Sequence, residues 1–171
     1  MTDFPIDTTR YVPDATQFIA PTATVIGAVT LGVGVSIWYG ASVRADLAAI
    51  TIGAGSNVQD NASIHVDPEL PAVIGCDVTI AHNAVVHGAV VGDGALIGMG
   101  SIILNRAVIG AGSLIAAGTV VREGMQVPPG SLVAGVPGKV LKTLSPQQQA
   151  HIRENAAIYV RVADAHREAL P

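Results

Sequence analysis

Aliphatic residues recur along this 171-residue chain at a spacing of six. From Val91 to Val133 the spacing is strict, and the position four residues after each aliphatic is mostly small. The same register extends upstream to Ile19, with breaks between 43 and 52, between 64 and 74 and between 86 and 91. The full series is Ile19, Val25, Leu31, Ile37, Val43, Ile52, Val58, Ile64, Ile74, Ile80, Val86, Val91, Ile97, Ile103, Ile109, Ile115, Val121, Val127 and Val133.

A period of six fits neither an α-helix nor an alternating β-strand. It is typical of a parallel β-helix, in which each hexad forms one side of a triangular coil and three hexads complete a turn. The series therefore corresponds to roughly six coils, with neighbouring coils about 4.8 Å apart. We predict an all-β fold in which residues 1–144 form this β-helix.

The hexads stop near residue 138, and the next segment has the features of a helix start. Ser145 suits the N-cap, Pro146 the first helical position, and Gln148 completes a capping box. An apolar stripe follows at helical spacing, made by Ile152, Ala156, Tyr159 and Ala163. We predict a helix from about 146 to 169, within a segment 145–171 that packs on the β-helix as part of one domain. His151 and His166 on this helix are expected to be solvated.

Composition narrows the functional classes. Half of the residues are hydrophobic and only 13% are charged, which excludes a disordered chain. A net charge of −4 provides no basic patch, so no nucleic-acid partner is expected. Polar residues interrupt every apolar stretch, and the N-terminus lacks the order of a secretory signal; we expect no membrane span and a cytoplasmic protein. The lone Cys76 excludes a disulfide framework and is assigned no role.

Coil arithmetic brings distant polar residues together. Residues three hexads apart stack directly, so Arg44, His65 and His87 form one column. His82 stacks on Asp60 in a second column, on a face turned away by about a third of a circle. His65 and His87 are close enough to share one metal ion, whereas His82 could complete their site only from an adjacent prism. The columns therefore predict a three-histidine metal site between the chains of a homotrimer.

Five segments resemble the γ-class carbonic anhydrases and related hexapeptide-repeat proteins. They are VRAD (43–46), SNVQDNASIH (56–65), VTIAHNAVVHG (78–88), IGMG (97–100) and GVPGKVLKTLS (135–145). The resemblance implies a left-handed β-helix, a trimer and Zn²⁺, or Fe²⁺ or Co²⁺ in some members. It implies His65, His82 and His87 as ligands, with His82 from the adjacent subunit. The implied reaction is reversible hydration of CO₂ to bicarbonate by a metal-bound hydroxide at the trimer interface.

The same resemblance implies further site residues. Gln59 corresponds to a glutamine that hydrogen-bonds the hydroxide or the substrate. Arg44, Asp46 and Asp60 correspond to charged residues at the interface; we expect ion pairs across subunits and orientation of bicarbonate by Arg44. Tyr159 corresponds to a tyrosine in the C-terminal helix of the family.

Two departures from the family concern proton transfer. Leu47 stands where the best-known members carry a glutamate directly after VRAD. The short segment HVDPELP (65–71) replaces a long acidic loop that bears a proton-shuttle glutamate; Asp67 and Glu69 are the local candidates for that role. A missing shuttle lowers turnover without abolishing metal binding, so the sequence predicts a γ-type carbonic anhydrase, with weak or lost hydratase activity as an open alternative.

Two alternative functions stay open at this stage. Hexapeptide-repeat proteins include acyltransferases, so an acyl-CoA thioesterase or acyltransferase on the same fold is one alternative. A non-catalytic, metal-stabilised trimer that binds a protein or small ligand is the other.

Overall fold

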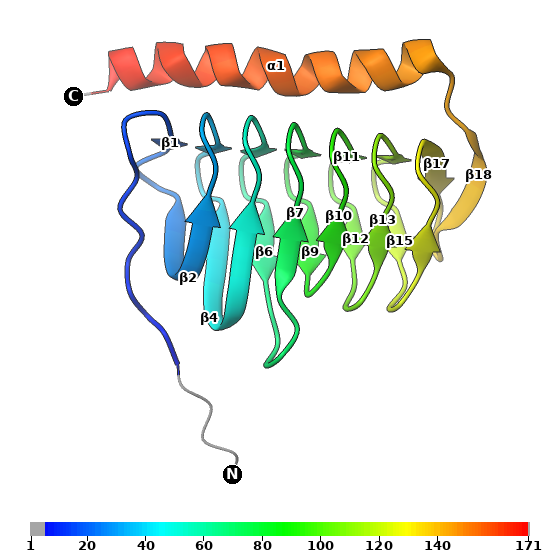
Figure 1. Cartoon of the computed structure of the whole chain (residues 1–171), viewed down its shortest axis with the longest axis horizontal. Coiled ribbons are helices and arrows are strands. Elements are labelled where there is room, and N and C mark those ends of the chain that lie inside the picture. The colour runs from blue at the N-terminus through cyan, green and yellow to red at the C-terminus, as the bar shows by residue number, and fades with distance from the viewer. Residues whose placement is uncertain (1–5, 171) are drawn as a thin grey trace.

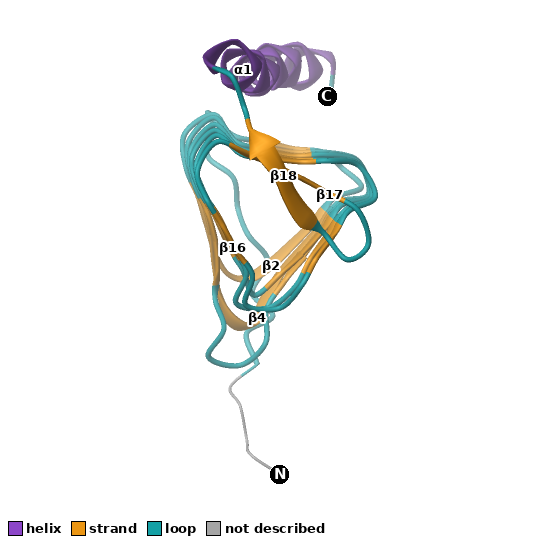
Figure 2. Ribbon diagram, turned by 90° about the vertical axis from the view of Figure 1, so that its right-hand side faces the viewer, coloured by secondary structure: helices purple, strands orange, loops and turns teal. Residues whose placement is uncertain are grey.

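The computed structural model describes residues 6–170, which form a triangular prism of parallel strands with a helix along its length (Figures 1 and 2). The predicted fold class is confirmed, a parallel β-helix of about six turns followed by a C-terminal helix. The strands are β1 (Phe18–Ile19), β2 (Thr24–Leu31), β3 (Ser36–Ile37), β4 (Ser42–Ile52), β5 (Asn57–Val58), β6 (Ser63–His65), β7 (Ala72–Ile74), β8 (Thr79–Ile80), β9 (Val85–His87), β10 (Val90–Val91), β11 (Leu96–Ile97), β12 (Ile102–Ile103), β13 (Val108–Ile109), β14 (Leu114–Ile115), β15 (Val120–Val121), β16 (Gln126–Val127), β17 (Ser131–Ala134) and β18 (Lys139–Thr143).

The strands stack into three faces. One sheet, with the order β1-β3-β5-β8-β11-β14-β17-β18, forms the face that we call the helix face. The second sheet bends around a corner within the long strand β4, so it supplies two faces. We call the one containing β6, β9, β12 and β15 the His65 face, and the one containing β7, β10, β13 and β16 the third face.

The interior is a stack of aliphatic side chains. Of the nineteen positions in the six-residue series, all except Ile19 are buried, and Ile19 is partly buried against the same core. Val and Ile suit this stack because branched side chains pack well on the pleated surface of a strand. The corners between faces require left-handed backbone, which Gly94 (φ 63°) and Asn83 (φ 58°) supply at little steric cost.

Both ends of the β-helix are covered by the chain itself. At the N-terminal end, residues 9–11 run antiparallel to β2, with Tyr11 N–H donating to Val25 O and Gly27 N–H to Thr9 O. At the other end, β18 pairs antiparallel with β17. These antiparallel segments occupy edges that would otherwise offer unpaired strands to another chain.

Helix α1 (Pro146–Ala169) runs back from the last coil to the first (Figure 1). Its predicted start is confirmed, because Ser145 is the N-cap and forms a capping box with Gln148. Ile152, Ala156 and Ala163 are buried against the prism. Among the described residues, no helix is long and apolar enough to cross a membrane.

The expectation of a solvated His166 is wrong. Its ring lies 5.0 Å from Trp38 and 5.8 Å from Phe18, and its Nδ1 is 2.9 Å from the Tyr39 hydroxyl. The helix is long enough to carry residue 166 back over the first coils, where these aromatic side chains lie. His151, near the start of the helix, is solvated as expected, with 89% of its side chain exposed.

The stack predicts that two adjacent positions of β7 differ strongly in their contribution to stability. Ile74 points inward and is 1% exposed, whereas Val73 points outward and is 41% exposed. Ile74→Ala leaves a cavity between coils and is expected to lower the free energy of unfolding by about 2–5 kcal/mol. Val73→Ala is expected to change it by about 0.5 kcal/mol or less. Urea unfolding of both variants checks this, and equal losses would contradict the inward–outward assignment.

Candidate metal centre

Adjacent parallel strands bring His65 and His87 together. His65 ends β6, His87 ends β9, and the two residues are paired in register. Arg44 in β4 is paired with His65 in the same way, so the predicted column of three residues is present. His65 Nδ1 lies 2.9 Å from His87 Nε2, and the ring centroids are 4.9 Å apart. Both rings are half-buried on the His65 face.

The second nitrogen of His65 is anchored by a carboxylate. His65 Nε2 lies 3.0 Å from Asp46 Oδ1, and the other oxygen of Asp46 pairs with the Arg44 guanidinium. Burial by itself would raise the pKa of Asp46, but hydrogen bonds from Arg44 and His65 outweigh it and hold this pKa below its usual value. Because an ionised carboxylate only accepts hydrogen bonds, His65 carries a proton on Nε2.

The second nitrogen of His87 is anchored by Asn105, which sequence reasoning missed. His87 Nδ1 lies 2.6 Å from Asn105 Oδ1. Asn105 stands two positions after the inward Ile103, in the column that contains Gly88 one coil earlier. A Cβ at Gly88 would lie only 2.8 Å from Asn105 Oδ1, so the glycine leaves room for this side chain. The coil arithmetic, extended to this column, would have found Asn105.

The facing nitrogens of the pair fit a bound cation. With protons on His65 Nε2 and His87 Nδ1, both nitrogens that face each other carry lone pairs. Lone pairs 2.9 Å apart repel unless a proton or a metal ion lies between them. Two zinc–nitrogen bonds of about 2.0–2.1 Å at a tetrahedral angle span about 3.3 Å, so the rings need to separate by only a few tenths of an ångström.

His82 lies at the edge of the helix face, away from this pair. Its Nδ1 is 2.9 Å from Asp60 Oδ2, and its Nε2 is 3.5 Å from the Tyr159 hydroxyl. Burial, and secondarily the charge of Asp60, raises the pKa of Tyr159, so the phenol stays protonated. Within residues 6–170, no three His, Cys, Asp or Glu side chains are grouped to hold a metal ion. One chain therefore assembles two of the three predicted ligands.

Buried hydrogen bonds connect Gln59 to the helix. Gln59 Oε1 accepts from the His82 backbone N–H at 3.3 Å, and Gln59 Nε2 donates to Asn57 Oδ1 at 3.0 Å. Asn57 Nδ2 donates to Thr79 Oγ1, which donates to Asn155 Oδ1 of α1 at 3.2 Å. Gln59, Asn57 and Thr79 are each at most 3% exposed. The His82 N–H can only donate, so it fixes the orientation of the Gln59 amide, and the bonds through Asn57 and Thr79 link this amide to the docked helix.

Comparison with known proteins identifies the family. A family model described as bacterial transferase hexapeptide (six repeats) matches residues 71–105 and 88–123. Gamma carbonic anhydrase 2, mitochondrial, of Arabidopsis thaliana is 38% identical over 159 residues, which cover 90% of this chain and 57% of that protein. A carbonic anhydrase of Geobacillus kaustophilus is 45% identical over 131 residues, covering 77% of this chain and 72% of that protein. The chain belongs to the γ-class carbonic anhydrase family.

The chain is also similar to a solved structure that carries a different description. A hexapeptide transferase family protein from Anaplasma phagocytophilum superimposes with a TM-score of 0.85 and 39% identity, covering 89% of this chain and 90% of that one. The Arabidopsis relative is much longer, since this γ-class chain spans little more than half of its length.

The two departures of this γ-class chain lie at the same corner of the prism, between the His65 face and the third face. Leu47 follows Asp46 and helps to line a cavity of about 380 Å³ with Ile6, Ala28 and Ala48. The segment 65–71 folds into a tight turn bridged between Asp67 and Leu70. Asp67 Oδ2 accepts from Asn105 Nδ2 at 2.8 Å, whereas Glu69 is exposed.

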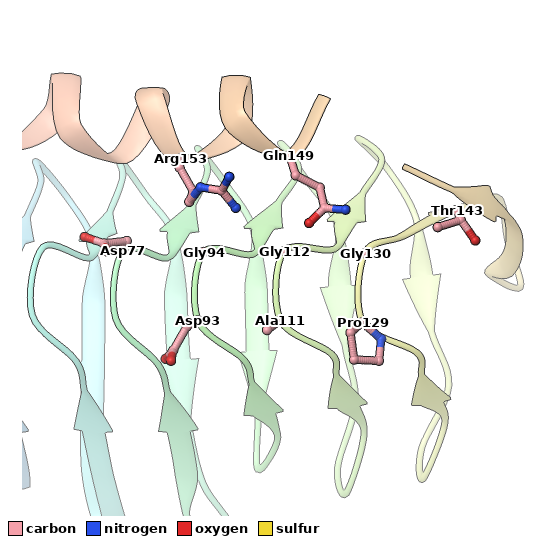
Figure 3. A pocket seen from close by; sticks show the side chains of 10 residues that line it. All are labelled: Asp77, Asp93, Gly94, Ala111, Gly112, Pro129, Gly130, Thr143, Gln149 and Arg153. Carbon is pink, nitrogen blue, oxygen red and sulfur yellow. The ribbon is translucent and has the colours of Figure 1, made fainter. Parts of the chain in front are cut away.

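A separate cavity of about 450 Å³ lies under the N-terminal half of α1 (Figure 3). Gln149 and Arg153 of the helix line it, together with Asp77, Asp93 and the stacked glycines at the corner of the coils. None of the eight predicted site residues lines this cavity. It is therefore distinct from the histidine site.

The hydrogen bonds that link Gln59 to α1 predict that a substitution on the helix lowers the stability of the protein. Asn155→Ala leaves the buried Thr79 hydroxyl without its acceptor and is expected to lower the free energy of unfolding by about 1–3 kcal/mol. Glu154→Ala, at the adjacent exposed position, is the matched control and is expected to change it by about 0.5 kcal/mol or less. Urea unfolding measures both, and an unchanged Asn155→Ala variant would show that these bonds contribute nothing to stability.

Proposed function

We propose that this chain is a metal-dependent carbonic anhydrase, which interconverts CO₂ and bicarbonate at a site shared between the chains of a homotrimer. The observation that carries the proposal is the His65–His87 pair, whose facing nitrogens lie 2.9 Å apart while their other nitrogens are anchored. Such a pair is suited to a cation. Membership of the γ-class carbonic anhydrase family supports CO₂ as the substrate.

The proposed ligands are His65 and His87 of one chain and His82 of its neighbour. Nδ1 of His82 is paired with the Asp60 carboxylate, so Nε2 is the nitrogen available to bind a metal ion. Three imidazoles suit Zn²⁺, with Fe²⁺ and Co²⁺ as alternatives, because nitrogen ligands do not select strongly among these ions. When bound, the metal supplies a Lewis acid that allows water to ionise near neutral pH.

The chain's own residues would prepare and orient the reactants. Asp46 and Asp60 hold the rings of His65 and His82. Arg44 is 44% exposed at its side chain, so it can donate to a bicarbonate oxygen while it stays paired with Asp46. The Gln59 amide is held in one orientation beside His82, which suits a hydrogen bond to the oxygen of water or substrate.

Stopped-flow CO₂ hydration tests the reaction. The protein is loaded with Zn²⁺ and, separately under anaerobic conditions, with Fe²⁺. We expect hydration that a chelator removes and that the same metal restores. A fully occupied metal site with no hydration under either condition would refute the hydratase proposal.

Metal content of histidine variants tests the shared site. His82→Ala is expected to lose most of the bound metal, whereas His151→Ala, on the solvated part of the helix, is expected to keep it. His65→Ala is likewise expected to lose the metal. When His82→Ala and His65→Ala chains are unfolded together and refolded, random trimers should regain about a quarter of the sites, because some interfaces then combine an intact pair with an intact His82. No recovery in correctly sized mixed trimers would exclude a site shared in this way.

One observation favours the acyl-CoA alternative. A cavity of about 350 Å³ adjoins His82 and Tyr159, and its walls include Leu96, Met99 and Leu114. This volume combines apolar walls with a few polar side chains and is far larger than CO₂ requires, so it could hold an acyl group. Acyl-CoA turnover that survives complete chelation would favour a thioesterase or acyltransferase. Full metal occupancy without either activity would favour the non-catalytic binding protein.

A further inference from the structure

We propose that Asn105 and Asp67 are positioning residues that set the tautomer of His87 and thereby leave its Nε2 free to bind metal. The metal-binding consequence rests on the proposed function above. The tautomer itself does not, because it is a property of the metal-free chain.

The Asn105 amide lies between a carboxylate and an imidazole. Its Nδ2 donates to Asp67 Oδ2 at 2.8 Å, and its Oδ1 is 2.6 Å from His87 Nδ1. A side-chain amide can be turned end for end without changing shape, so its neighbours decide its orientation. Asp67 decides it here, because a carboxylate only accepts hydrogen bonds and therefore requires the NH₂ group.

The orientation of the amide then determines where His87 carries its proton. An amide oxygen can only accept, so His87 Nδ1 must donate, and in the neutral ring His87 Nε2 then keeps a lone pair. The opposite tautomer would direct a lone pair at the amide oxygen over 2.6 Å, which is repulsive. His87 Nε2 is the atom that faces His65. Asp67, through Asn105, therefore prepares one of the two facing nitrogens.

The short segment 65–71 holds the Asp67 carboxylate beside Asn105. Leu70 N–H donates to Asp67 O at 3.1 Å, which closes a turn in which Glu69 has left-handed backbone (φ 63°). Gly88 lies beneath it, and a Cβ there would meet Leu70 at 3.4 Å and Asn105 at 2.8 Å. The turn, the glycine and the amide thus pack as one unit. In this chain, the segment that replaces the family's acidic loop positions a metal ligand.

Nitrogen-15 NMR of the histidine rings tests the proposal on metal-free, full-length protein. In the wild type, His87 is expected to be protonated on Nδ1, with Nε2 as the acceptor. Asn105→Ala removes the acceptor and is expected to give a mixture of tautomers. Asp67→Asn keeps the shape but allows the Asn105 amide to turn, and is expected to shift the mixture in the same direction by less.

Zinc affinity, measured by competition with a chelator, gives the second readout. Asn105→Ala is expected to weaken Zn²⁺ binding about 10- to 100-fold, the range for residues that orient a metal ligand. Arg106→Ala is the matched control, because Arg106 follows Asn105 in the same turn and pairs with Glu123 instead. We expect it to change neither the tautomer nor the affinity.

The two readouts separate failure of this proposal from failure of the hydratase proposal. An unchanged His87 tautomer in folded Asn105→Ala overturns the positioning role, whatever the CO₂ activity. The double variant Asp67→Asn, Asn105→Ala is expected to match Asn105→Ala alone, since Asp67 acts through Asn105; additive losses would also overturn it. If Asn105→Ala does not fold, Asp67→Asn carries the tautomer test by itself.

Discussion

The stacking of one coil on the next is the interaction on which the rest of the structure depends. Parallel hydrogen bonds hold neighbouring coils about 4.8 Å apart, and the buried aliphatic stack keeps every coil in the same register. Because of this register, residues one full coil apart in the sequence lie next to each other on adjacent strands. His65 and His87, 22 residues apart, thereby become neighbours with nitrogens 2.9 Å apart. No loop has to be ordered to form the pair, so the scaffold pre-organises it.

The site follows from hydrogen-bond chemistry imposed on that register. Each of the three histidines has one nitrogen held by an oxygen, from Asp46, Asp60 or Asn105. The other nitrogen is then left with a lone pair, and in the His65–His87 pair two lone pairs face each other. The geometry favours a cation between them, and in the proposed trimer His82, on another edge of the prism, would be the third ligand from a neighbouring chain.

Helix α1 and the turn at 65–71 both act on the site from outside the coils. The helix supplies Asn155 to the buried hydrogen bonds that end at Gln59, and it places Tyr159 beside His82. The turn supplies Asp67 to Asn105. Asp67 selects one orientation of the Asn105 amide, because a carboxylate accepts hydrogen bonds only from the NH₂ end. Asn155 instead links the helix to hydrogen bonds that end at Gln59, whose amide is oriented by the His82 backbone N–H.

The sequence by itself determined the coils, the inward positions, the helix from 146 to 169 and the column that contains His65 and His87. It could do so because period and capping are local patterns, and because a regular coil makes stacking a matter of counting. Only the tertiary structure decided that His166 packs among aromatic rings and that Asp67 accepts a hydrogen bond from Asn105. Those contacts depend on where the returning helix and an irregular turn lie in space. Neither follows the repeat, so no count along the chain predicts their partners.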